Sequence, residues 1–159
     1  VMTMPNGFLG TRADLLLDLV IASLVLVVPV LLISWMKVRR GEYAVHKTIQ
    51  LAVFTIVGLA VLAFELHMRQ LGGIFEATKE SAFAGTTLLN GWIYVHTAFS
   101  VSMALVWIAL VAGALWLFPR PPRPVKGSHV HRWLGRLGMV LALGAGATAI
   151  PLYIYGFAY

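Results

Sequence analysis

Histidines are the residues of this chain whose type and spacing point most directly to chemistry. His46 and His67 lie three heptads apart, so both imidazoles can occupy one seam of a packed helix. The helical rise separates them by about 31 Å, close to the thickness of the hydrocarbon core of a bilayer. Imidazole binds zinc, copper, nickel, iron and haem iron. The spacing therefore predicts a helix that carries one potential ligand at each face of a membrane.

Composition indicates that membrane helices position these histidines. The chain of 159 residues is 60% hydrophobic and only 11% charged, and its mean hydropathy is +0.86, which is typical of an integral membrane protein. A net charge of +6 would suggest a nucleic-acid partner in a soluble chain. Here the basic residues cluster in loops, as they do in membrane proteins, so no nucleic acid is expected. The absence of cysteine excludes disulfides, thiolate metal sites and a cysteine nucleophile.

Four long apolar runs predict four transmembrane helices in a single domain of residues 1–159. A polar leader over residues 1–12 has no basic segment and no cleavage site typical of a signal peptide, so the first span is expected to target the chain. Short connections favour an antiparallel four-helix bundle, an all-α membrane fold. The predicted helices cover about residues 13–36, 44–69, 91–117 and 130–155.

Basic residues are distributed unevenly between the two sides of this bundle. Three lie on the side of the termini: Arg12, Arg69 and Lys79. Nine lie in or beside the connections that follow the first and third runs: Lys37, Arg39, Arg40, Lys47, Arg120, Arg123, Lys126, Arg132 and Arg136. The positive-inside rule then places both basic connections in the cytoplasm and both termini outside.

In this topology three histidines form an inner group, His46, His129 and His131. Cations surround this group, and Glu42 is the nearest acid. A haem would suit the group, because Arg and Lys side chains can pair its propionates. The fourth run continues from His131 with a row of small residues, which leaves room for a flat group. The same row is what close helix packing in a membrane requires, and packing is the favoured interpretation.

The outer pair, His67 and His96, lies at the depth of several acids. Imidazoles mixed with the carboxylates of Glu65, Asp14 and Asp18 would suit a hard or borderline metal ion. The predicted metal ligands are His67, His96, Glu65 and Asp18. Glu65 and His67 point about 160° apart on a helix, so Glu65 is expected to face a neighbouring groove. The alternatives are that the aspartates interact with the helix dipole and that the histidines bind headgroups or loop carbonyls.

Between these two depths the first three helices contain no ionisable residue. A proton or ion path needs polar positions at the membrane midplane, so transport is disfavoured. Two haems at these depths would have irons about 30 Å apart, a long distance for electron tunnelling. The chain has no glycine-rich phosphate loop, nucleophile elbow or H-E-x-x-H motif, so no catalytic residue is assigned and a non-enzymatic role is favoured. A metal-dependent enzyme using Glu65, His67 and His96 is a remote alternative.

The histidine pattern resembles that of the YozB/CtaM family of small bacterial membrane proteins over about residues 15–158. His46-Lys47 opens the second helix and His67 closes it, His96 lies early in the third, and His131-Arg132 opens the fourth in the run HRWLGRLG. The resemblance implies a multi-pass protein of the bacterial inner (cytoplasmic) membrane. It also implies a maturation or accessory role beside a haem–copper terminal oxidase, with oxidase subunits and the bilayer as partners.

Three functions remain open at this point. The first is a respiratory accessory or assembly protein that binds haem or copper through its histidines. The second is a b-type membrane cytochrome, an electron carrier with haem held by two histidines. The third is a purely structural subunit of a larger membrane complex.

Overall fold

The computed structural model of the protein describes residues 5–159, and every described regular element is helical. Two short elements accompany the long helices, the single turn α3 (Ile74–Ala77) and the π-helical turn η1 (Ile154–Ala158). Each long helix has the length and hydropathy needed to cross a membrane, so the protein is an all-helical membrane protein with four candidate spans. The long helices are α1 (Leu15–Arg39), α2 (Tyr43–Gln70), α4 (Thr87–Leu117) and α5 (Ser128–Tyr153).

The four predicted spans are confirmed, and side-chain caps explain where two of them begin. Helix α1 begins at Leu15 because the Asp14 carboxylate accepts a hydrogen bond from the Leu17 N–H at 3.0 Å. Helix α4 begins at Thr87, earlier than predicted, because the Thr86 hydroxyl accepts from the Leu89 N–H at 3.3 Å. Such caps satisfy backbone donors that have no partner within the helix.

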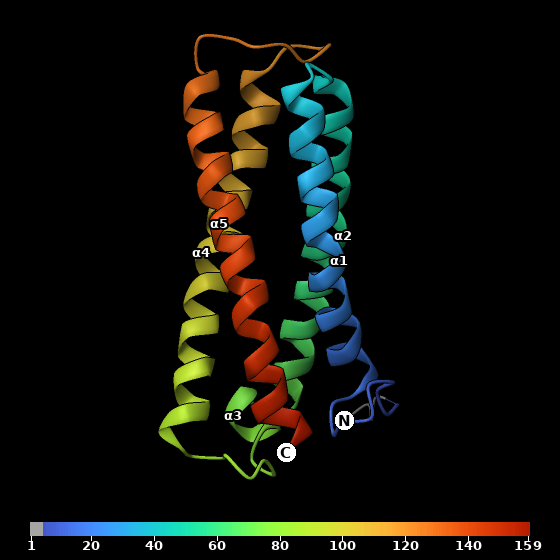
Figure 1. The fold of residues 1–159 in the computed structure, drawn as a ribbon, viewed down its shortest axis with the longest axis vertical. Coiled ribbons are helices and arrows are strands. Elements are labelled where there is room, and N and C mark those ends of the chain that lie inside the picture. Colours follow the sequence, from blue (N-terminus) through green and yellow to red (C-terminus); the bar gives the residue numbers. More distant parts are fainter. Residues whose placement is uncertain (1–4) are drawn as a thin grey trace.

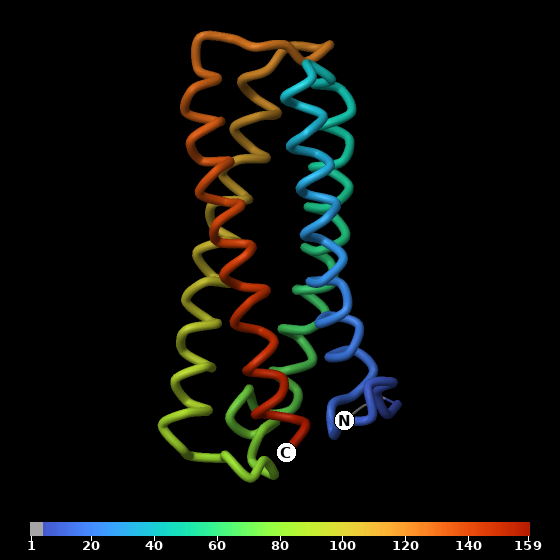
Figure 2. The backbone as a smooth tube through the Cα atoms, in the orientation of Figure 1, coloured from blue at the N-terminus to red at the C-terminus, as the bar shows by residue number. Residues whose placement is uncertain are grey.

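The long helices pass in turn between two ends of an elongated bundle (Figure 1). The N-terminus, α3 and the C-terminus lie at one end, which we call the terminal end. The α1–α2 and α4–α5 connections lie at the other, which we call the basic end. The backbone trace shows two hairpins side by side, α1 with α2 and α4 with α5 (Figure 2), and most interhelical contacts lie within these pairs.

A core of buried apolar side chains from all four long helices joins the two hairpins. Its buried members are Leu31, Val53, Val57, Met103, Ala142 and Ala145. Large apolar side chains cover the outer surface as well, among them Leu26, Ile56, Leu105 and Trp116. An exterior this apolar requires a lipid environment, because a soluble monomer exposes only limited apolar patches.

Small residues of α5 allow close packing against α4. A Cβ at Gly138 would lie 3.2 Å from Trp107 and Leu110, and a Cβ at Gly144 would overlap the Phe99 ring. This contact confirms the packing interpretation of the small-residue row, which is the usual reason for such rows in membrane helices.

Candidate functional site

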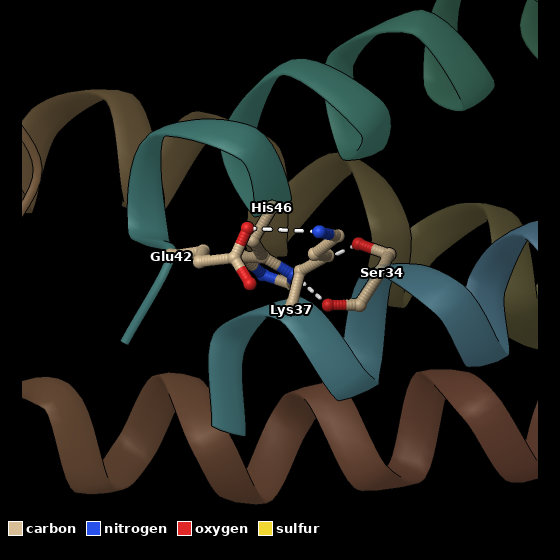
Figure 3. Close-up of polar contacts among 4 residues, drawn as sticks. All are labelled: Ser34, Lys37, Glu42 and His46. Atoms are coloured by element: carbon tan, nitrogen blue, oxygen red, sulfur yellow. Dashed lines mark hydrogen bonds and ion pairs between the residues drawn. The ribbon is translucent and has the colours of Figure 1, made fainter. Parts of the chain in front are cut away.

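At the basic end, His46 lies in the first part of α2 and is held by a buried serine of α1. Its Nδ1 lies 2.8 Å from the Ser34 Oγ and 3.1 Å from the Ser34 carbonyl oxygen (Figure 3). A carbonyl oxygen only accepts, so Nδ1 donates in that contact. Gln50 Nε2 also donates to the Ser34 Oγ at 3.0 Å. This arrangement fixes the ring and leaves Nε2 of neutral His46 with a lone pair for a ligand.

A single ion pair closes the α1–α2 turn next to His46. Lys37 Nζ lies 2.9 Å from the Glu42 carboxylate (Figure 3). Glu42 is the acid nearest to the predicted inner group, and Lys37 already neutralises it. The surroundings of His46 are therefore neutral or positive rather than acidic.

His131 lies in the first turn of α5 and is half-buried, and its described contacts are apolar. The ring meets Phe118 edge-on, with centroids 5.1 Å apart. It also borders a small hollow of about 90 Å³ lined by apolar side chains and glycines of α4 and α5. His46 and His131 both lie near the starts of the helices that follow the connections of the basic end. The structure therefore places these two members of the predicted inner group at the same end of the bundle, and none of their described contacts joins the two rings.

The third member of that predicted group, His129, lies on a different face of α5. It is exposed, and its Nδ1 lies 3.2 Å from the Lys126 carbonyl oxygen. Successive helical positions two apart point in nearly opposite directions, which separates His129 from His131. His129 instead borders a shallow surface hollow of about 470 Å³, which we call the basic hollow, lined by His129, Val130, Arg132, Trp133 and Arg136.

At the terminal end, His67 is buried and pairs with an acid of α1. Its Nε2 is hydrogen-bonded to the Asp14 carboxylate, while its Nδ1 is buried without a hydrogen-bond partner. The sequence led us to expect His96 of the third span as its partner. In the structure α2 packs mainly on α1, and His67 meets Asp14 instead.

The predicted seam of α2 is itself confirmed. Val53, Val57 and His67 are all buried, and both His46 and Gln50 bond to Ser34 of α1. The heptad spacing identified which residues share a face, because that is a property of one helix. The neighbour that this face meets depends on how α2 is rotated in the bundle.

His96 joins α4 to α5 and has partners for both of its ring nitrogens. Nδ1 lies 3.2 Å from the Ala145 carbonyl oxygen and 3.1 Å from the Thr148 Oγ1. Nε2 lies 3.2 Å from the Ser100 Oγ. The residue thus stabilises the packing of two helices, as polar groups commonly do inside membrane bundles.

The remaining predicted metal ligands also have separate surroundings. Asp18 is fully buried and accepts hydrogen bonds from the Tyr153 hydroxyl and, at 2.7 Å, from the Leu9 N–H. Glu65 is exposed, whereas its angle from His67 led us to expect it in a neighbouring groove. Within residues 5–159, no three His, Cys, Asp or Glu side chains come together in a metal-binding arrangement. Nothing in the described chain therefore assembles His67, His96, Glu65 and Asp18 into one site.

Asp18 belongs to a polar network that sequence reasoning missed. The Tyr153 hydroxyl also bonds to the Thr11 Oγ1 at 2.7 Å, and the Arg12 guanidinium donates to the Gly156 carbonyl oxygen at 3.2 Å. The described part of the predicted leader, residues 5–12, is thereby fastened to the C-terminal turn; residues 1–4 lie outside the described range. An aspartate just before an apolar run predicts a helix cap. No local pattern in the sequence predicts that Asp18 will accept a hydrogen bond from a tyrosine so distant along the chain.

Comparisons with protein families, with curated proteins and with solved structures found no match for this chain. The family resemblance therefore rests on the histidine pattern alone. What the protein binds has to be argued from its own side chains.

Proposed function

We propose that the protein is a multi-pass accessory or assembly protein of a haem–copper-type respiratory complex in the bacterial inner membrane, and that it holds a copper ion between His46 and His131. In this proposal the helices form an antiparallel transmembrane bundle. The basic end faces the cytoplasm and both termini lie outside, as the distribution of basic residues favours. The respiratory role follows from the histidine pattern.

The observation that carries the ligand assignment is the hydrogen bond from His46 Nδ1 to the Ser34 carbonyl oxygen, at 3.1 Å, in a ring that lies at the same end of the bundle as His131. Histidines that bind metals commonly donate their other ring N–H to a carbonyl or carboxylate, which sets the tautomer and the orientation. Ser34 is fully buried, so it provides a rigid support. His46 and His131 would hold the ion, and Ser34 would orient His46.

The size of the adjoining space favours an ion over haem. The hollow beside His131 has a volume of about 90 Å³, whereas pockets for organic ligands span about 300–1,000 Å³. A haem macrocycle does not fit in this hollow, which His131 lines and His46 does not, and this makes the b-type cytochrome the weaker candidate. Zinc usually takes about four ligands, while Cu(I) is stable with two nitrogen donors, and imidazole suits copper.

Metal analysis of the purified protein tests this assignment. Detergent-solubilised protein is loaded with Cu(I), freed of excess metal, and assayed for copper together with its absorption spectrum. We expect the wild type to retain copper, and His46→Ala and His131→Ala each to lose it. His129→Ala is the matched control, because His129 lies at the same end on a different face, and it should retain copper. Unchanged retention in both site variants, or a haem Soret band from haem-replete cells, would contradict the proposal.

A structural subunit is the second candidate, because the partners of His67 and His96 are already explained by packing. The two functions differ in a cellular assay. Ala replacement of His46 and His131 should lower the copper content and activity of the terminal oxidase if the protein supplies copper. Full oxidase assembly and activity in those variants would favour the structural role.

A further inference from the structure

The basic hollow on α5 is a second feature of the basic end, separate from the His46–His131 pair. Arg132 and Arg136 are one turn apart and share a helix face with His129. All three side chains are exposed, and so is Trp133 beside them. The hollow of about 470 Å³ that they border opens on the outside of the bundle.

No acid neutralises these charges within the part of the chain that is described. The ion pairs among residues 5–159 are Lys37–Glu42, Lys79–Glu76 and His67–Asp14. Glu42 is the acid of the basic end, and it is already paired with Lys37. Two guanidinium groups therefore border the hollow without a protein anion. The guanidinium fork matches the oxygens of a phosphate group, which it can bind through two parallel hydrogen bonds.

The face that carries the arginines becomes apolar further along α5. Val140 and Leu143 follow Arg136 at helical spacing and are both exposed. Exposed tryptophan at the junction is typical of the membrane interface. A basic hollow that continues into a lipid-facing apolar strip matches a molecule with a phosphate head and acyl chains, and it does not match free phosphate or a nucleic acid.

We propose that the basic hollow binds the phosphodiester headgroup of an anionic glycerophospholipid, with the acyl chains lying along Val140 and Leu143. Arg132 and Arg136 bind the phosphate, and Trp133 lies at the level of the glycerol. Anionic lipids attract basic groups beside membrane helices in the same way at other membrane surfaces. This site does not depend on copper binding, since neither arginine is among the residues that line the hollow beside His131.

Native mass spectrometry of the full chain in detergent tests the proposal. The protein is titrated with phosphatidylglycerol and, separately, with zwitterionic phosphatidylcholine. We expect tighter binding of phosphatidylglycerol, and a loss of about 25-fold in that affinity for the double variant Arg132→Gln/Arg136→Gln, about fivefold for each arginine. Binding of phosphatidylcholine should fall less in this variant, because its choline cation already offsets the phosphate charge. If the double variant does not fold, Arg136→Gln alone replaces it in the test, with the smaller expected loss of affinity for phosphatidylglycerol.

The matched control is Arg120→Gln/Arg123→Gln, which removes the same charge from exposed positions in the neighbouring connection. It should bind phosphatidylglycerol as the wild type does. Equal weakening in the two double variants would show attraction to net charge instead of a site, and would overturn the proposal. Displacement of the lipid by inorganic phosphate would overturn it as well, because it would mean that the acyl chains contribute nothing. Weaker binding of phosphatidylglycerol by the Val140→Asn variant would support the contact between Val140 and the acyl chains.

Discussion

The two ends of the bundle use the same side chain in opposite ways. At the terminal end His67 is buried and bound to the Asp14 carboxylate. At the basic end His46 is half-buried, and only its Nδ1 has a described partner, on Ser34. Both histidines belong to one seam of α2, so the difference does not come from the helix that carries them. It comes from the polar groups beside each ring, which are acids at the terminal end and a neutral serine at the basic end.

Acids are tolerated inside the terminal end because the chain supplies donors to them. The Leu9 N–H and the Tyr153 hydroxyl both bond to Asp18. Gly7 lies so close that any Cβ there would overlap the Asp18 side chain. A buried carboxylate is stable only when it is hydrogen-bonded in this manner. The terminal end therefore uses its polar groups to hold the structure, whereas at the basic end the described partner of His46 is the neutral Ser34.

The sharpest test of this contrast is Asp18→Ala. The substitution leaves the Tyr153 hydroxyl and the Leu9 N–H without their acceptor, so we expect the free energy of unfolding to fall by about 3–5 kcal/mol. Thermal and denaturant unfolding in detergent measure the change. Glu65→Ala at the same end is the control, since Glu65 is exposed, and should be neutral. A neutral Asp18→Ala would mean that the network does not stabilise this end.

Paired variants of α2 separate the two ends directly. His67→Ala removes a buried partner of Asp14 and should lower the free energy of unfolding by about 2–3 kcal/mol while copper retention stays unchanged. His46→Ala should cost only about 1 kcal/mol, because Gln50 still bonds to Ser34, and should abolish copper retention. Copper analysis and unfolding are measured on the same preparations. Similar effects of the two substitutions on both quantities would remove the distinction between the ends.

Tyr153→Phe should have a smaller effect than Asp18→Ala at the same end. Asp18 keeps the Leu9 N–H as a donor, so we expect a loss of about 1–2 kcal/mol in the free energy of unfolding. Tyr94→Phe is the control, because the Tyr94 ring is exposed on α4 and meets Phe75. Protease cleavage of residues 5–14 should also become faster in Tyr153→Phe alone. Equal cleavage rates in the two variants would show that Tyr153 does not fasten this segment.

The sequence by itself determined the four apolar helices and the shared seam of His46 and His67. It also determined that the first three helices carry no ionisable residue between the depths of these histidines. These features depend on hydropathy, length and helical spacing, which are properties of each segment alone. Helix ends were predicted less accurately, because caps such as Asp14 and Thr86 fix them through individual side chains.

Only the tertiary structure decided which groups meet. Asp14 and His67 are 53 positions apart in sequence, and Asp18 and Tyr153 are 135 apart. At the outer depth His67 meets Asp14 and His96 meets Thr148, while at the other end His46 meets Ser34. The rotation of each helix about its axis sets these partners. That rotation is determined by the packing of all four helices at once, including small residues such as Gly138 and Gly144.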